Sequence, residues 1–180
     1  MDPVTISTYQ PEWPRRFANL AGKLRAELGD VAMRIDHIGS TAVVGLAAKP
    51  IVDIQISVAE LEPLAAFRGP LEQLGYVYRA DNPDRTKRYF RESPGARRTH
   101  IHVRRSGTQA EQAALLFRDY LRSHADDAAQ YEDRKRELAE RHRDDRRLYT
   151  EAKSSFIEEA MQRADQWRHE VAWAPGPSDA

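Results

Sequence analysis

The stretch HIGSTAVVGLAAKPIVDIQISV, residues 37–58, decides the fold. It places Gly-Ser-Thr near one end of an apolar run and Lys-Pro, followed three residues later by Asp53, near the other. Within residues 50–58, Val or Ile occupies every even position from 52 to 58. Alternation with a period of two predicts a β-strand with one apolar face. Asp53 falls on the other face, close to the start of that strand.

The residues before this strand predict an anion-binding turn. A strand over 31–39 ends at Gly39, and Ser40 and Thr41 are favourable N-cap residues for a short helix. Glycine lets a phosphate approach the backbone, and the free N–H groups of a helix start attract anions. Asp53 would then hold a divalent cation that bridges the phosphates.

Lys49 would add a positive charge at the mouth of the same site. Because Pro50 restricts the residue before it to extended backbone, the Lys49 side chain is directed. A P-loop is excluded, since Gly39 and Gly45 lie six positions apart and Leu46 stands where that motif needs lysine.

The composition is that of an ordinary globular protein with a polar surface. The chain has 180 residues, 41% hydrophobic and 31% charged, and its formal net charge is zero. Nothing in this balance indicates binding to nucleic acid or to an anionic membrane. The absence of Cys excludes disulfides and Cys-ligated zinc. No apolar run is long enough for a membrane span, and the first residues do not read as a signal peptide, so a cytoplasmic location is expected.

The remaining periodicity predicts a mixed sheet flanked by helices, an α/β (α+β) fold. Further strands are expected at 4–8, 76–79, 86–92 and 97–105, the last two as a hairpin, and helices at 13–28 and 60–74. Helical patterns then fill 109–124, 127–145 and 149–170. We therefore expect an α/β core over 1–106, a helical part over 107–172 packed on the same domain, and a disordered tail over 173–180.

The stretch DHIGSTAVVGLAAKPIVDIQISV resembles the signature segment of the GrpB family (UPF0157). YQPEWPRRF, THIHV, LLFRDYLRSH, YEDRKRELA and YTEAKSSFI resemble other segments of that family. The resemblance covers about residues 4–170 and implies a nucleotidyltransferase-like fold. That superfamily carries Gly-Ser or Gly-Gly, then Asp-x-Asp or Asp-x-Glu. Gly39, Ser40 and Asp53 match, whereas Gln55 stands at the second carboxylate position.

The strand that would supply a third carboxylate carries His100 and His102 instead. The two residues are two positions apart and therefore share a face. If that face meets Asp53 and His37, these groups could ligate a metal ion or act as acid–base groups. The expected cation is Mg²⁺, with Mn²⁺ or Zn²⁺ as alternatives. The metal ligands are predicted as Asp53, His102 and His37.

Further phosphate-binding residues are expected on the hairpin and in the helical part. Lys87 and Arg88 point to opposite faces of their strand, and we predict that Arg88 faces the cleft. The resemblance indicates Lys135, Tyr149 and Lys153 as recurrent family positions. Tyr149 and Lys153 are four residues apart, so they share a helix face.

Three functions remain open. The first is transfer of a nucleoside monophosphate from an NTP to a small acceptor, with Asp53, His100 and His102 as the catalytic residues. The second is a module that binds a nucleotide or another phosphorylated small molecule without turnover, which Gln55 favours. Because some GrpB-type domains are fused to dephospho-CoA kinase, the resemblance includes coenzyme A-related ligands. The third is a His-based metal site. The interspersed charges of 134–147 indicate a solvated helix rather than a nucleic-acid-binding segment.

Overall fold

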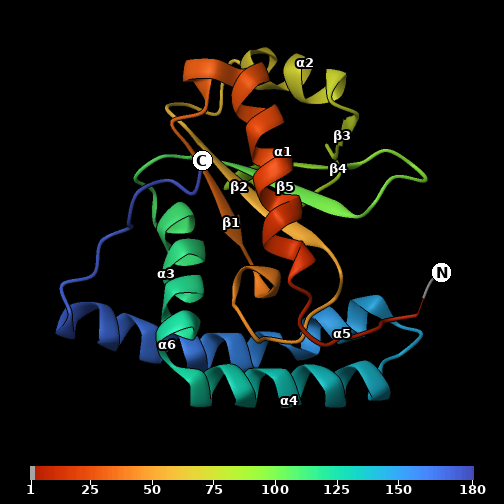
Figure 1. The fold of residues 1–180 in the computed structure, drawn as a ribbon, viewed down its shortest axis with the longest axis vertical. Helices are drawn as coiled ribbons and strands as arrows, with labels where there is room; N and C mark the ends of the chain where they lie inside the picture. The colour runs from red at the N-terminus through yellow and green to blue at the C-terminus, as the bar shows by residue number, and fades with distance from the viewer. Residues whose placement is uncertain (1–2) are drawn as a thin grey trace.

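A five-stranded mixed sheet forms the centre of the computed structural model, which describes residues 3–180. Its strand order is β1-β2-β5-β4-β3 (Figure 1). The strands are β1 (Arg34–Ile38), β2 (Val52–Val58), β3 (Tyr76–Tyr78), β4 (Lys87–Glu92) and β5 (Thr99–Arg105). Only β2 and β5 pair in parallel among these strands, and the other neighbours are antiparallel. The predicted fold class is therefore confirmed, including the antiparallel pairing of β4 with β5.

One face of the sheet carries the main hydrophobic core. The fully buried Ile54 and Ile56 of β2 and Ile101 of β5 point to this face. Helix α1 (Glu12–Leu28) crosses in front of the sheet in Figure 1, and α2 (Ala65–Gln73) packs beside it at one end. Burial of alternate strand residues against the apolar stripe of α1 is the expected source of stability.

The helical part packs on the end of the sheet where β1 finishes and β2 begins. It consists of α3 (Gln109–Ser123), α4 (Ala125–Arg141), α5 (Arg146–Ala152) and α6 (Ser154–Glu170). Figure 1 shows α3 beside β1, and α4, α5 and α6 across the end of the sheet. Val43 and Leu46, from the loop after β1, enter the same hydrophobic cluster as Leu116 and Tyr120 of α3. This cluster joins the helices to the loop that carries the Gly-Ser-Thr sequence.

Several elements are shorter than the sequence indicates. The expected strand at 4–8 is reduced to one bridge between Ser7 and Ala48. Ser40 and Thr41 begin a 3₁₀ turn, η2 (Ser40–Ala42), rather than an α-helix, and a second such turn, η1 (Gly29–Val31), follows α1. The helix expected over 149–170 is divided into α5 and α6 at Lys153.

The C-terminal tail differs from the expected disorder, because it lies along the outer edge of β1. The backbone N–H of Ile35 donates to Ser178 Oγ at 2.9 Å, and that of His37 donates to Asp179 Oδ2 at 2.9 Å. The N–H of Ala180 donates to the carbonyl of Ile35 at 3.1 Å. These bonds satisfy edge-strand groups that would otherwise face solvent. A tail rich in Pro, Gly and Ser gives no periodic signal, so its docking was not visible in the sequence.

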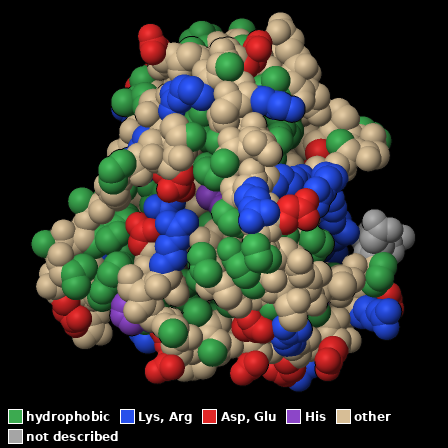
Figure 2. Space-filling view, viewed as in Figure 1, with side chains coloured by type: hydrophobic (Ala, Val, Ile, Leu, Met, Phe, Trp, Pro, Cys, Tyr) green, Lys and Arg blue, Asp and Glu red, His purple; other side chains and the backbone are tan. Residues whose placement is uncertain are grey.

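The described surface mixes both signs of charge. Acidic and basic side chains are interspersed over the face shown in Figure 2. Within residues 3–180, no helix combines the length and the apolar character that a membrane crossing requires.

Candidate functional site

The strand register brings Asp53, His100 and His102 to one face of the sheet. In the β2–β5 pair, Asp53 lies opposite His100 and Gln55 lies opposite His102. Directly opposed residues share a face, so this polar face is the reverse of the one that Ile54 buries. Sequence alternation predicted this arrangement for each strand separately, and the parallel pairing aligns the two strands.

The two imidazoles converge on a single carboxylate oxygen. His100 Nδ1 and His102 Nε2 each lie 3.2 Å from Asp53 Oδ1. One ligand atom from each of the three residues lies within 4.8 Å of the other two. Their side chains are 27% (Asp53), 19% (His100) and 14% (His102) exposed, so the cluster is sheltered but reachable.

The Asp53 carboxyl group, at the centre of the cluster, is ionised. Burial opposes ionisation of Asp53, but the hydrogen bonds from His100 and His102 outweigh it and hold the pKa of the carboxyl well below its usual range. Burial lowers the pKa of His102, partly offset by Asp53. A neutral imidazole next to an ionised carboxylate is the protonation state that a metal ligand set requires.

The cluster fits a divalent cation. A carboxylate and two imidazoles converge on one point, which is a donor set that suits transition metals better than the all-oxygen shell that Mg²⁺ prefers. The far nitrogens, His100 Nε2 and His102 Nδ1, are buried and have no hydrogen-bond partner among residues 3–180. Asp53, His100 and His102 are therefore the residues that would hold the cation.

Gly39 forms the wall beside Asp53. Its backbone has φ +70° and ψ −173°, a conformation that is essentially restricted to glycine. A Cβ at this position would lie 2.9 Å from Asp53 Oδ2. The Gly-Ser sequence thus serves two needs, because it makes the turn and leaves room for the carboxylate. Ser40 and Thr41 follow at once and line the cleft.

Five cationic side chains line the cleft, which has a volume of about 380 Å³. Lys49 precedes β2 and Arg98 precedes β5. Lys135 lies in α4, Arg146 begins α5, and Lys153 lies between α5 and α6. Tyr149 lies between two of them, with Lys49 Nζ 3.9 Å and Lys153 Nζ 5.0 Å from its ring centroid. Tyr149 therefore holds two ammonium groups at the cleft through cation–π contacts.

Burial lowers the pKa of the cleft lysines. It lowers the pKa of Lys135 to about 7 and that of Lys49 to about 8, with help in both cases from the Lys153 charge. The pKa of Lys153 is also lowered by burial. Lys135 is only 2% exposed and donates to the carbonyl of Ala47. Like charges in a partly buried cleft are costly without an anion, so this arrangement favours binding of an anionic ligand.

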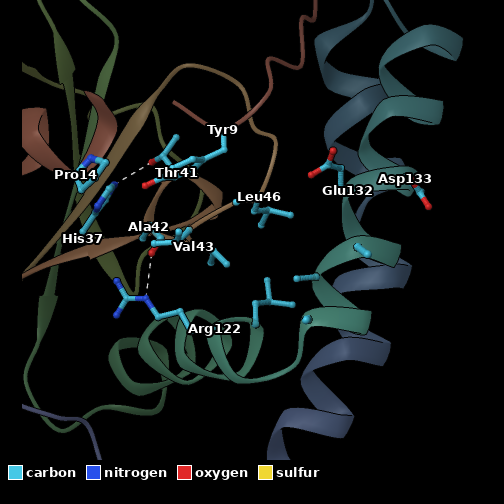
Figure 3. A pocket seen from close by; sticks show the side chains of 16 residues that line it. Tyr9, Pro14, His37, Thr41, Ala42, Val43, Leu46, Arg122, Glu132 and Asp133 are labelled. Carbon is cyan, nitrogen blue, oxygen red and sulfur yellow. Dashed lines mark hydrogen bonds between the residues drawn. The ribbon is translucent and has the colours of Figure 1, made fainter. Parts of the chain in front are cut away.

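The structure places His37 away from the cluster, so the prediction of His37 as a metal ligand was wrong. His37 lies opposite Ile54 in the β1–β2 pair and therefore points to the α1 face. Its ring stacks on Phe17 at a centroid distance of 4.8 Å, and Nε2 lies 3.0 Å from Thr41 Oγ1. Burial lowers its pKa to about 4, so the ring is neutral. It lines a separate cavity of about 690 Å³ (Figure 3).

Arg88 also lies on the wrong face for the predicted role. It is opposite Val103, on the core side, and pairs with Glu62 at 2.8 Å. Lys87 is opposite Arg104 and shares the face of His102. Strand alternation shows that Lys87 and Arg88 point to opposite faces of the sheet. Only the pairing register shows which of the two faces the site.

The sequence did not identify two cationic residues of the cleft, Arg98 and Arg146. Arg98 alternates with His100 and His102 along the predicted strand, and that spacing could have identified it. Arg146 lies in a run of mixed charge that does not distinguish it from its neighbours.

Gln55 does not project into the cleft. It is fully buried, and its Nε2 donates to the carbonyl of Glu111 in α3 at 3.2 Å. The neighbouring Ser57 donates to Glu111 Oε1 at 2.6 Å. The position that carries a second carboxylate in the superfamily therefore anchors α3 to the sheet in this chain.

Known proteins are similar to this chain over most of its length. The model of the family described as "GrpB protein" matches residues 3–163. A UPF0157 protein of Halalkalibacterium halodurans is 36% identical over 162 residues, covering 90% of this chain and 83% of the relative. The UPF0157 protein YqkA of Bacillus subtilis is 34% identical over 92% of this chain, which spans 48% of its length. A dephospho-CoA kinase of Mycolicibacterium paratuberculosis is 31% identical over 96% of this chain and 49% of the kinase.

Solved structures agree with the fold. The crystal structure of the conserved protein GrpB from Enterococcus faecalis superposes with a TM-score of 0.83 at 34% identity, covering 91% of this chain and 99% of that one. Cid1, solved in complex with its short product ApU, gives a TM-score of 0.50 at 14% identity over 76% of this chain and 43% of Cid1. The second likeness shows only that the fold is nucleotidyltransferase-like. With a family model matched over residues 3–163, the chain belongs to the GrpB family.

Proposed function

We propose that this protein binds a nucleoside triphosphate through a divalent cation at Asp53, His100 and His102, and transfers the nucleoside monophosphate to a small acceptor. The observation that carries the proposal is the position of this cluster next to the five cations of the cleft. A metal ligand set beside a cationic cavity matches the needs of a metal-bridged polyphosphate. The nucleotidyltransferase-like fold supports the same ligand class.

Backbone groups and cationic side chains would have different roles at the phosphates. Gly39 and Ser40 bring backbone close to the phosphates, and Lys49, Lys153 and Arg98 face their negative charge. A bound cation would polarise the phosphate oxygens as a Lewis acid. In the transfer, an acceptor hydroxyl oxygen forms a bond to the α-phosphorus, and the bond from that phosphorus to the pyrophosphate oxygen breaks. The hydroxyl proton passes to a water molecule of the cleft, because His100 and His102 both serve as ligands of the cation.

The donor set favours Mn²⁺ or Zn²⁺ over Mg²⁺ as the cation. Mg²⁺ is held mainly by oxygen ligands, whereas two of the three ligands here are imidazoles. One carboxylate, with Gln55 turned to α3, supports a single cation rather than the pair used in two-metal transfer.

A second candidate function is binding without turnover. The buried Gln55 favours it, because the second carboxylate that assists transfer is missing from the cleft. The likeness to dephospho-CoA kinases adds coenzyme A-related molecules to the ligands to be tried.

Thermal unfolding with a panel of ligands tests both candidates. ATP, GTP, UTP, dephospho-CoA and CoA are compared with and without Mg²⁺, Mn²⁺ and Zn²⁺, on the native chain and on Asp53→Asn. A ligand present at a hundredfold excess over its Kd stabilises the folded state by roughly 2.7 kcal/mol. A metal-dependent shift that Asp53→Asn loses supports the proposed site, and release of pyrophosphate then separates transfer from binding alone.

Asp30→Asn is the matched control, because Asp30 is an exposed carboxylate in η1, remote from the cleft. Equal ligand shifts in Asp53→Asn and in the native chain would contradict the proposal.

A further inference from the structure

The polar face that carries Asp53 continues across β5 and β4. Paired side chains of these two strands form three rows there, which we call the grid. On the far side of β5 from β2, residues of β4 lie directly opposite those of β5. Arg91 faces His100, Tyr89 faces His102, and Lys87 faces Arg104. The metal cluster therefore lies between two cationic regions of the molecule, the cleft on one side and β4 on the other.

This half of the face is open, unlike the half over β1 and β2. Helix α3 covers the latter through Glu111, which binds Ser57, and through the buried Arg118, which lies 3.7 Å from Asp36. Side chains of β4 and β5 on the same face remain partly exposed along both strands. Val77 of β3, opposite Arg91, is 42% exposed.

The unsatisfied polar atoms also concentrate here. Five buried side-chain nitrogen or oxygen atoms lack a hydrogen-bond partner among residues 3–180. Four of them lie in the β4–β5 half, Arg91 Nε, His100 Nε2, His102 Nδ1 and Arg104 Nε, and the fifth, Gln55 Oε1, lies on the same face under α3. A buried polar group without a partner costs free energy, so such a concentration marks a place where bound groups would supply partners.

The charges and the ring of this half suit a nucleotide-like molecule. Lys87 lies 3.3 Å from Asp84, and Arg91 lies 3.1 Å from Glu92. Arg104 instead contacts the Thr86 hydroxyl at 3.2 Å, and no carboxylate of residues 3–180 lies within ion-pair distance of it. Guanidinium groups bind phosphates in pairs of hydrogen bonds, and a tyrosine ring supports a stacked base.

From this grid we infer that the β4–β5 half of the face is an acceptor subsite for a small phosphorylated molecule with an aromatic ring, of which a mononucleotide is the simplest form. The ring would lie against Tyr89, and the phosphate against Arg104 and Lys87. The three rows of the grid span about 14 Å along the strands, which is room for one nucleotide rather than a polymer. The inference rests on the proposed function, since it names the second ligand of the same reaction.

Calorimetric titration with AMP tests the subsite. The protein is first saturated with Mn²⁺ and a non-hydrolysable ATP analogue, so that the cleft is filled before AMP is added. We expect AMP to bind to this complex and Arg104→Gln to weaken that binding about tenfold or more. Adenosine, which lacks the phosphate, should bind at least tenfold more weakly than AMP.

Arg105→Gln is the matched control, because Arg105 is the next residue of β5 and is exposed, pairing with Glu60 at 3.3 Å. We expect AMP affinity to be unchanged in this variant. If Arg104→Gln does not fold, as judged by circular dichroism, Lys87→Gln with Arg88→Gln as its control replaces it.

Three results would overturn the subsite: no AMP binding to the saturated complex, equal effects of Arg104→Gln and Arg105→Gln, or binding of a short oligoadenylate that is much tighter than AMP. The last would indicate a nucleic-acid surface. Titration of Mn²⁺ alone keeps this outcome separate from the proposed function. Normal Mn²⁺ binding in Arg104→Gln, with its loss in Asp53→Asn, leaves the metal site standing even if the acceptor subsite fails.

Discussion

At the scale of single residues, Gly39 and Asp53 depend on each other. The carboxylate occupies the space that any other residue at position 39 would fill with its Cβ. We predict that Gly39→Ala lowers the free energy of unfolding by about 1–3 kcal/mol, because of its strained φ and the contact with Asp53. Displacement of the carboxylate should also weaken Mn²⁺ binding. Urea unfolding and metal titration measure the two effects.

Gly45→Ala separates the contact from the backbone strain. Gly45 also has a positive φ, +83°, but a Cβ there meets nothing within 4 Å. Its substitution should cost stability while leaving Mn²⁺ affinity unchanged. If both variants bind Mn²⁺ as the native chain does, Gly39 has no role in positioning Asp53.

Lys135 makes the stability of the free protein depend on pH. Burial lowers its folded pKa to about 7, against an ordinary value of 10.5. Between these values the unfolded chain binds more protons, so stability rises with pH by up to about 1.4 kcal/mol per pH unit from this residue. Affinity for a phosphate ligand should fall over the same range as the positive charge is lost.

Urea unfolding at pH 7, 8 and 9 checks this prediction, with Lys135→Met and, as a control, the exposed Lys23→Met of α1. Lys135→Met should reduce the rise and leave the part that comes from Lys49 and Lys153, whereas Lys23→Met should keep the whole rise. An equal slope in all three proteins would show that Lys135 is not the titrating group.

At the scale of elements, Gln55 ties α3 to the sheet. Its amide donates to the carbonyl of Glu111, next to the carboxylate that accepts from Ser57. We predict that Gln55→Glu, which restores a carboxylate at the superfamily position, destabilises the protein by about 1–3 kcal/mol. The substitution removes the donor and places a charge beside a carbonyl and a second carboxylate.

Gln55→Met keeps a similar volume without charge and should destabilise less. Urea unfolding measures both variants, and metal titration gives their stoichiometry. Unchanged stability of Gln55→Glu together with a second bound cation would mean that residue 55 reaches the cleft.

Sequence periodicity predicted most strands and helices and three residues of the site, Asp53, His100 and His102. The period of two along β2 and β5 put Asp53, His100 and His102 on polar faces. The helical patterns located α1 and α3 to within one residue at each end, whereas α4 ends at Arg141, four residues before the expected end. Alternation could not rank Lys87 above Arg88, because both faces of β4 carry polar residues. Nor could it reveal that His37 faces α1, since an imidazole is compatible with either a buried or a liganding position.

At the scale of the whole molecule, the C-terminal tail closes one edge of the sheet. Asp179 accepts from the buried Arg118 at 2.9 Å as well as from the backbone of β1. Removal of residues 174–180 should destabilise the protein by about 1–3 kcal/mol and promote self-association through the exposed edge. Urea unfolding and analytical ultracentrifugation measure these effects.

Asp179→Asn gives a finer test, since it keeps the backbone of the tail and weakens only the ion pair. It should lose part of the stability and remain monodisperse to the same degree as the native chain. A truncated chain with native stability would show that the tail does not contribute to the fold.

We propose above all that the carboxylate and two imidazoles that β2 and β5 bring next to the cationic cleft bind one divalent cation. Calorimetric titration of Mn²⁺ in the presence of a non-hydrolysable ATP analogue tests it most directly. We predict one cation per chain, with affinity reduced at least a hundredfold in Asp53→Asn and strongly in His102→Ala. Mn²⁺ affinity that stays the same in both variants would contradict it.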